Sequence, residues 1–211
     1  MGKIDIVTIV IIAANVLISY KGFNDFSFFE KYKFNVGGLR RGEQIRMFSS
    51  GFLHVDMQHL LFNMVTLYFF SGLVIFRLGT VGFLTVYIGS LLIGNFLSYY
   101  FHKDEYDYSA VGASGAVMGI IYSAILFDPM MKINFFIPGF AFGIGYLLYS
   151  IYGMKKRIGN IGHDAHFGGA VGGYILTLIL APYLFQTSLL FVALLAIPII
   201  ILFIMQRMGK I

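Results

Sequence analysis

The sequence contains no cysteine, and this absence excludes disulfides, thiolate metal sites and cysteine nucleophiles. Charged residues are also scarce: they make up 12% of the 211 residues, whereas a soluble domain carries about a quarter. Hydrophobic residues account for 58% of the chain. Because so few charges can cover only a small water-facing surface, we expect one membrane domain over residues 1–211.

The charges that are present have a basic excess, with 15 basic residues against 10 acidic ones. The basic residues lie in the connections and at the ends of apolar runs, and they do not follow one helical face. This placement favours contact with the headgroups of a lipid bilayer over binding of nucleic acid.

Seven apolar runs approach the ~20 residues that cross a bilayer as a helix. They predict an all-α, polytopic helical membrane protein, and they lie at about 4–20, 58–76, 81–100, 112–127, 133–152, 163–183 and 188–206. The run at 112–127 is short, and the run at 133–152 is interrupted by Pro138. The one long connection, residues 21–57, interleaves aromatic and charged residues, so we expect it to fold on or into the membrane surface.

The loop charges favour one orientation of these spans. If the N-terminus is cytoplasmic, the inside segments hold only Lys3, Arg77 and Lys132 of the 15 basic residues. The positive-inside rule therefore favours the reverse orientation.

The stretch VGASGAVMGI at 111–120 has two interpretations. In the first, Gly112, Gly115 and Gly119 are small residues that let membrane helices pack closely, and Ser114 is a minor polar contact. In the second, Ser114 is a nucleophile, which requires a base and an oxyanion site elsewhere in the chain.

Polar residues also open the second span, HVDMQHLLFNM, which contains His54, His59 and Asn63. Because His59 and Asn63 are four residues apart, they share a helical face and can direct two donors to one place. His54 lies off that face. The alternative is that these side chains form hydrogen bonds between helices, as polar groups in membrane spans commonly do.

The sixth span opens with GHDAHFGGAVGG and brings His166 onto the same face as Gly169 and Gly173. This small-residue face can seat closely against another helix, so a helix carrying Ser114 can approach until the two side chains form a hydrogen bond. Asp164 is two residues, or about 200° of rotation, from His166. We therefore predict a Ser–His pair without a carboxylate.

Two other kinds of hydrolase fit less well. A zinc enzyme needs H-E-x-x-H or three comparable ligands, and no glutamate occurs after Glu105, so we predict no metal site. A soluble α/β-hydrolase needs G-x-S-x-G on a strand-to-helix turn, and here the second glycine stands one position early.

Three motifs, in this order along the chain, resemble those of the rhomboid intramembrane serine proteases: HVDMQHLLFNM at 54–64, GASG at 112–115 and AHFGG at 165–169. The long first loop, with Glu43 and Arg46 in GEQIRMFSSGFLH, agrees with this resemblance. So does the arrangement of a six-span core at about 4–183 followed by an extra span at about 188–206.

The resemblance implies a role for each matched residue. Ser114 would be the nucleophile and His166 the general base. His59, Asn63 and the backbone N–H of Ser114 would form the oxyanion hole, while His54 would brace the first loop structurally, together with Glu43 and Arg46. Family members cut transmembrane segments of other membrane proteins and need no cofactor.

Two alternatives to a protease remain open. The first is an inactive rhomboid-like protein that binds membrane clients, although such a relative usually lacks the serine or the histidine. The second is a small transporter, since intramembrane histidines and broken helices also line transport paths. The compact chain shows no recognisable organelle transit peptide, so we expect a bacterial plasma membrane.

Overall fold

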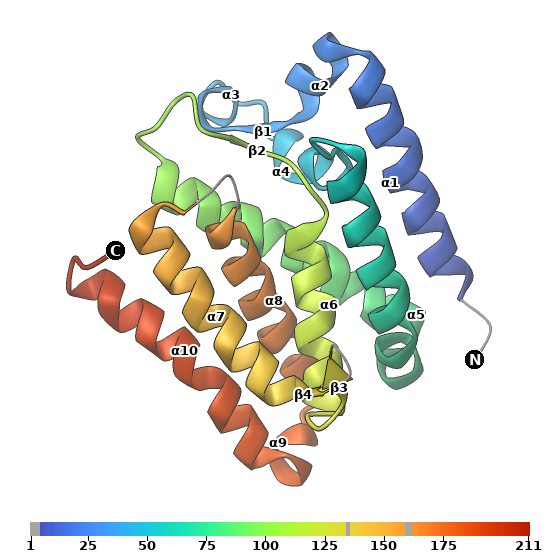
Figure 1. The fold of residues 1–211 in the computed structure, drawn as a ribbon, viewed down its shortest axis with the longest axis vertical. Coiled ribbons are helices and arrows are strands. Elements are labelled where there is room, and N and C mark those ends of the chain that lie inside the picture. Colours follow the sequence, from blue (N-terminus) through green and yellow to red (C-terminus); the bar gives the residue numbers. More distant parts are fainter. Residues whose placement is uncertain (1–4, 134–135, 159–161) are drawn as a thin grey trace.

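The structure is a computed structural model that describes residues 5–133, 136–158 and 162–211. Lys3 and the first residue of the predicted run at 4–20 lie outside the described residues, as do residues 134–135 of the run at 133–152. The chain forms a bundle of long helices with short helices and two small two-stranded sheets at its ends (Figure 1).

The bundle consists of six long helices, among the residues described. These are α1 (Ile6–Asn24), α5 (Met57–His102), α6 (Ser114–Phe127), α7 (Gly139–Lys156), α8 (His163–Leu180) and α10 (Leu189–Arg207). The short helices are α2 (Phe26–Tyr32), α3 (Val36–Arg40), α4 (Arg46–Ser49), α9 (Leu184–Thr187) and a 3-10 turn (Ser50–Phe52). Strands β1 (Phe34–Asn35) and β2 (Ser109–Ala110) pair with each other, as do β3 (Lys132–Ile133) and β4 (Ile137–Pro138).

The helix α5 covers two of the predicted spans, at 58–76 and 81–100, because the chain turns back at Gly79. Gly79 has a φ of 69°, a conformation that glycine adopts without the penalty of a Cβ atom. After the turn, the Asn95 side chain donates a hydrogen bond of 2.7 Å to the carbonyl of Met47, near the end where α5 began. The two halves of α5 therefore run in opposite directions.

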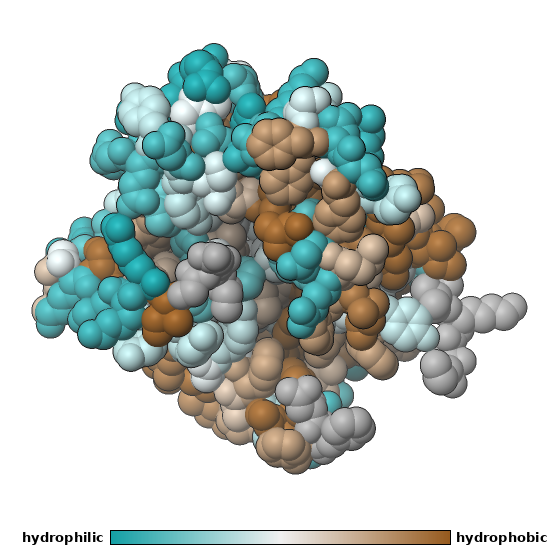
Figure 2. Space-filling model, turned by 45° about the horizontal axis from the view of Figure 1, so that its top comes forward, coloured by the Kyte–Doolittle hydropathy of each residue, from teal (hydrophilic) through white to brown (hydrophobic). Residues whose placement is uncertain are grey.

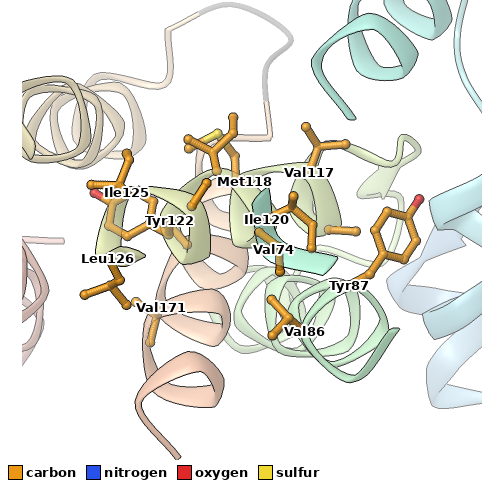
Figure 3. Packing of buried hydrophobic residues seen from close by; sticks show 14 of the residues in the cluster. Val74, Val86, Tyr87, Val117, Met118, Ile120, Tyr122, Ile125, Leu126 and Val171 are labelled. Carbon is orange, nitrogen blue, oxygen red and sulfur yellow. The ribbon is translucent and has the colours of Figure 1, made fainter. Parts of the chain in front are cut away.

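Three helices in the described part of the chain, α1, α5 and α10, are long and apolar enough to cross a membrane. The helix α6 has only 14 residues, and it is buried from Gly115 to Leu126. A helix that is apolar on every side belongs in the interior of a bundle. Figure 3 shows Ile120 of α6 near Val74 of α5 and Leu126 near Val171 of α8.

The helices α6 and α8 meet at glycines. A Cβ atom on Gly169 would lie 2.8 Å from the Cα of Gly115, and one on Gly173 would lie 2.7 Å from the carbonyl carbon of Gly119. The four glycines predicted to pack helices at these positions therefore lie at one backbone-to-backbone contact. Such close approach is how membrane helices gain van der Waals contact when lipid provides no hydrophobic drive.

An adjacent face of α8 meets the second half of α5 in the same way. A Cβ atom on Gly168 would lie 2.9 Å from the Cα of Gly94, and one on Gly172 would lie 2.9 Å from the Cα of Ser90. The helices α5, α6 and α8 thus form the tightly packed centre of the bundle.

The prediction that Pro138 interrupts a span over 133–152 is wrong. Strands β3 and β4 form a short antiparallel hairpin, and α7 begins only at Gly139. Pro138 is the residue that precedes the helix, where its lack of an N–H group breaks no helical hydrogen bond.

The first loop, residues 21–57, is folded into α2, β1, α3 and α4. Arg46 is buried within it and donates hydrogen bonds to the carbonyls of Glu30 (2.7 Å) and Lys33 (2.9 Å). Arg46 also forms an ion pair of 2.5 Å with Glu43. Hydrophilic side chains cover the top and left of Figure 2, while apolar side chains cover much of its right and lower parts.

We predict that Gly169→Ala lowers the thermal stability of the protein, because the new Cβ atom forces α6 away from α8. Overpacking of this kind costs about 1–3 kcal/mol. Gly72→Ala is the matched control, since a Cβ atom there meets no atom of the described residues within 4 Å. Thermal unfolding in detergent measures both variants, and equal melting temperatures would contradict the tight contact.

We also predict an acid-sensitive contribution from the ion pair in the first loop. The hydrogen bond from Arg46 holds the pKa of Glu43 below its ordinary value of 4.5. A lowered pKa stabilises the folded state above about pH 4.5, and this contribution is lost as the pH falls through the folded-state pKa.

The measurement is the melting temperature of the parent and of Glu43→Gln across a pH series. The parent is expected to be more stable at pH 7, and the difference is expected to shrink in acid. A difference that stays constant down to pH 3 would show that Glu43 does not act through its charge.

Candidate active site

Ser114 is the first residue of α6, directly after a loop whose backbone is held in place. Gly112 donates its N–H to the carbonyl of Ser50 at 3.0 Å. Gly112 has a φ of 134°, and a Cβ atom there would lie 2.9 Å from Nε2 of His59. Although predicted to pack helices, Gly112 instead lies in this loop, where only glycine fits both the backbone and the histidine ring.

His54 connects this loop to α1. Its Nε2 accepts a hydrogen bond of 3.3 Å from the backbone N–H of Ala113, and its Nδ1 lies 2.9 Å from the hydroxyl of Ser19. That hydroxyl donates to the carbonyl of Phe52, so it accepts from His54. Burial lowers the pKa of His54 to about 3, which keeps the ring neutral with its proton on Nδ1.

These contacts are the ones through which His54 could act as the structural brace that the resemblance implies. The ring bridges the end of the first loop, α1 and the residue that precedes Ser114. Ser19 was not identified from the sequence, because one serine in an apolar run has no distinguishing pattern.

His59 and Asn63 lie on the first two turns of α5. Asp56 caps this helix, since its carboxylate accepts the backbone N–H of His59 at 2.7 Å. The His59 ring and the Ser114 hydroxyl both lie within 3.5 Å of the position that a Cβ atom on Gly112 would take. The Nδ1 atom of His59 is buried and has no hydrogen-bond partner among the described residues.

Asn63 is buried, and its side-chain amide donates one hydrogen bond, at 2.9 Å, to the carbonyl of His59. This bond holds the Asn63 amide on the helical face that Asn63 was predicted to share with His59. An amide nitrogen has two hydrogens, so the second remains available to an acceptor.

His166 lies one turn before Gly169 on α8, and Gly169 contacts Gly115, the neighbour of Ser114. The Nδ1 atom of His166 is 2.7 Å from the hydroxyl of Tyr146 on α7. This contact occupies Nδ1 and leaves Nε2 as the ring nitrogen that can interact with another group.

Tyr146 was not identified from the sequence. It is one of 14 tyrosines. It lies 20 residues before His166 in the chain, and no local sequence pattern links two residues at that separation. Only the packing of α7 against α8 brings the two side chains together.

Asp164 was expected to point away from His166, and its carboxylate faces other groups. It accepts a hydrogen bond of 3.3 Å from the hydroxyl of Tyr108 and lies 3.4 Å from Nε2 of His102. The pair of Ser114 and His166 therefore has no carboxylate from this position.

The start of α6 adds a backbone contribution to the site. The first N–H groups of a helix have no partner within the helix, and no side chain caps α6 among the described residues. These groups and the helix dipole favour negative charge beside Ser114. In the described residues, no group of three His, Cys, Asp or Glu side chains is arranged to hold a metal ion.

Comparison with known proteins agrees with this arrangement. The Rhomboid domain model matches residues 41–183. The rhomboid-family protein YdcA of Bacillus subtilis is 34% identical over 140 residues, which are 66% of this chain and 69% of YdcA.

Two further relatives are more distant. RHOMBOID-like protein 12, mitochondrial, of Arabidopsis thaliana is 27% identical over 77% of this chain and 54% of its own length. The rhomboid protease GluP of Bacillus subtilis is 27% identical over 64% of this chain and 26% of its own length. The chain thus spans about half of the first of these proteins and about a quarter of the second. Since the family model covers most of the sequence and both halves of the candidate site, the chain belongs to the rhomboid family.

Proposed function

We propose that this protein is an intramembrane serine protease that hydrolyses peptide bonds in or near the transmembrane segments of other membrane proteins. The observation that carries the proposal is the glycine contact between α6 and α8, which brings the ends bearing Ser114 and His166 together. Membership in a family whose relatives include a named rhomboid protease supports it.

The proposed reaction uses a Ser–His dyad. In the proposed reacting state, His166 carries its proton on Nδ1, which lies 2.7 Å from the hydroxyl of Tyr146, and its Nε2 accepts the proton of Ser114. The Ser114 oxygen attacks the carbonyl carbon of the substrate, and His166 passes the proton to the leaving amine. Water then hydrolyses the acyl-enzyme by the reverse sequence of proton transfers.

The proposed oxyanion hole consists of the backbone N–H of Ser114, the free amide hydrogen of Asn63 and the ring of His59. Two of these donors are held before the substrate arrives. Ser114 is fixed by the loop that Gly112 and Ala113 anchor, and Asn63 by its bond to the carbonyl of His59. Preorganised donors stabilise the charge that develops on the carbonyl oxygen without reorganising during the reaction.

The proposed architecture is a six-span core formed by α1, the two halves of α5, α6, α7 and α8, followed by α10 as a seventh span. The whole chain then forms one rhomboid-like domain over 1–211. Successive spans alternate in direction, so α6, α8 and the first half of α5 all begin at the same side of the membrane. Water reaches a site at the ends of the spans, whereas the hydrocarbon core provides none.

The proposed partners are transmembrane substrates and the lipid bilayer, with no cofactor, metal or nucleic acid. The protein is integral to a membrane, and we propose a bacterial plasma membrane, although several matched relatives are named as mitochondrial. A client-binding protein without catalysis is the alternative that the following experiment distinguishes.

We predict that a fluorophosphonate probe labels the purified protein and that Ser114→Ala and His166→Ala each lower the labelling at least ~10³-fold, since the members of a dyad act together. Ser27→Ala, an exposed serine of α2, is the control and is expected to label as the parent does. No labelling of a folded parent would favour the client-binding alternative.

We further predict that Asn63→Ala slows fluorophosphonate labelling on the order of 10²-fold, because one oxyanion donor is lost. Thr66→Ala is the matched control: Thr66 lies on the same helix and also bonds the carbonyl four residues earlier, but it is half-buried, whereas Asn63 is buried. Rates are compared after both variants have shown the melting temperature of the parent. Equal rates for Asn63→Ala and the parent would remove Asn63 from the oxyanion hole.

A further inference from the structure

A cavity of about 450 Å³ lies one helical turn from His166, at the end of the bundle that carries the candidate site. It is bounded by the ends of α5, α7 and α10 and by the start of α8. The mechanism proposed above uses none of its lining residues.

The rim of the cavity is basic. Lys155, Arg157 and Lys210 line it, together with the carboxylates of Glu105 and Asp164. The two lysines form no ion pair with any residue in the described ranges. Their ammonium groups are therefore available to an anionic group at the rim of the cavity.

The two carboxylates already have partners. Glu105 pairs with Arg157 at 3.2 Å and lies 3.1 Å from Nδ1 of His102. Asp164 lies 3.4 Å from Nε2 of His102 and accepts a hydrogen bond from Tyr108. Neither acid is therefore free to neutralise the lysines. An anion that enters the cavity meets carboxylates whose charge is already paired, so they repel it less.

His163 lines the inner wall of the cavity and is only 4% exposed. Neither of its ring nitrogens has a hydrogen-bond partner among the residues that the structure describes. The ring packs edge-on against Tyr149 and lies where a Cβ atom on Gly153 would otherwise stand. A buried polar ring without partners is costly, so this histidine indicates a missing ligand.

The remaining wall is apolar, since Phe101, Met154 and Ile158 also line the cavity. Phe101 and Met154 pack against the main hydrophobic core. A ligand that fits therefore has an anionic head beside the lysines and an apolar portion beside these side chains. A free inorganic anion would use only the polar half.

We propose that this cavity binds the phosphate headgroup of an anionic phospholipid. The location is suitable, because the ends of membrane-spanning helices lie at headgroup depth, and basic pockets between such helices bind anionic headgroups. The phosphate lies between Lys155 and Lys210 and supplies a hydrogen-bond partner to His163. A bound lipid joins α7, which carries Tyr146, to α8, which carries His166.

The test is thermal unfolding of the purified protein in micelles titrated with phosphatidylglycerol or, separately, with phosphatidylcholine. Phosphatidylglycerol is expected to raise the melting temperature with a saturable dose dependence, as a ligand of the folded state does. Phosphatidylcholine is expected to have a smaller effect. No stabilisation by phosphatidylglycerol would overturn the proposal.

Matched variants distinguish a defined site from general charge attraction. Lys155→Gln and Lys210→Gln are each expected to weaken the apparent affinity for phosphatidylglycerol about five-fold. Lys156→Gln removes the same charge from an exposed neighbour that does not line the cavity, and it is expected to change the affinity less. Equal losses in Lys155→Gln and Lys156→Gln would overturn a specific site.

A third arm identifies the source of the phosphate. Inorganic phosphate at matched concentration is expected to leave the melting temperature unchanged, because it lacks the apolar portion. Stabilisation by inorganic phosphate that is lost in Lys155→Gln would overturn the lipid and assign the cavity to a free anion. The readout is binding, so the result does not depend on whether Ser114 is catalytic.

Discussion

The candidate site depends on how closely α6 can approach α8. Two helices carrying ordinary side chains pack with their axes about 8–10 Å apart, and this separation would keep groups at their surfaces apart. Glycine at 115 and 169 removes the side chains from the contact, so the backbones themselves touch. The contact lies immediately after Ser114 and one turn after His166. The two glycines, which have no reactive side chain, therefore determine how closely the helices that carry Ser114 and His166 approach each other.

A second constraint acts on the orientation of Ser114. The helix contact brings α6 near α8, but it does not fix the loop through which α6 begins. That loop is held by hydrogen bonds from Gly112 to Ser50 and from Ala113 to His54, and His54 is itself held by Ser19. A neutral, fully bonded histidine is inexpensive to bury. The two histidines at the start of the second span thus have separate tasks, since His54 supports the backbone while His59 faces the site.

The bilayer explains why the polar groups gather at one end of the molecule. Every ionisable group at membrane depth must be paired or lie near water. The candidate site, the folded first loop and the basic cavity all satisfy this condition at the end where α6 and α8 begin. The helix α7 contacts both regions, because Tyr146 bonds His166 and Lys155 lies on the rim of the cavity. The helix α7 therefore contributes one side chain to each region.

The sequence by itself determined the features that local patterns encode. Apolar runs of membrane length predicted the helical bundle, and small residues spaced four apart marked the faces at 115–119 and 169–173 that the structure brings together. The spacing of His59 and Asn63 placed both on one face of a helix, as found. These predictions succeed because helix periodicity converts sequence distance directly into direction.

The tertiary structure alone decided the contacts between segments far apart in the chain. Tyr146 reaches His166, and Ser19 reaches His54, only through the packing of separate helices. The place where α7 begins also depended on the hairpin before it, so Pro138 was misread as an interruption. A single polar residue in an apolar run forms no periodic pattern that could point to a partner far away in the chain. For this physical reason, the hydrogen-bond partners of His54 and His166 became visible only in the folded protein.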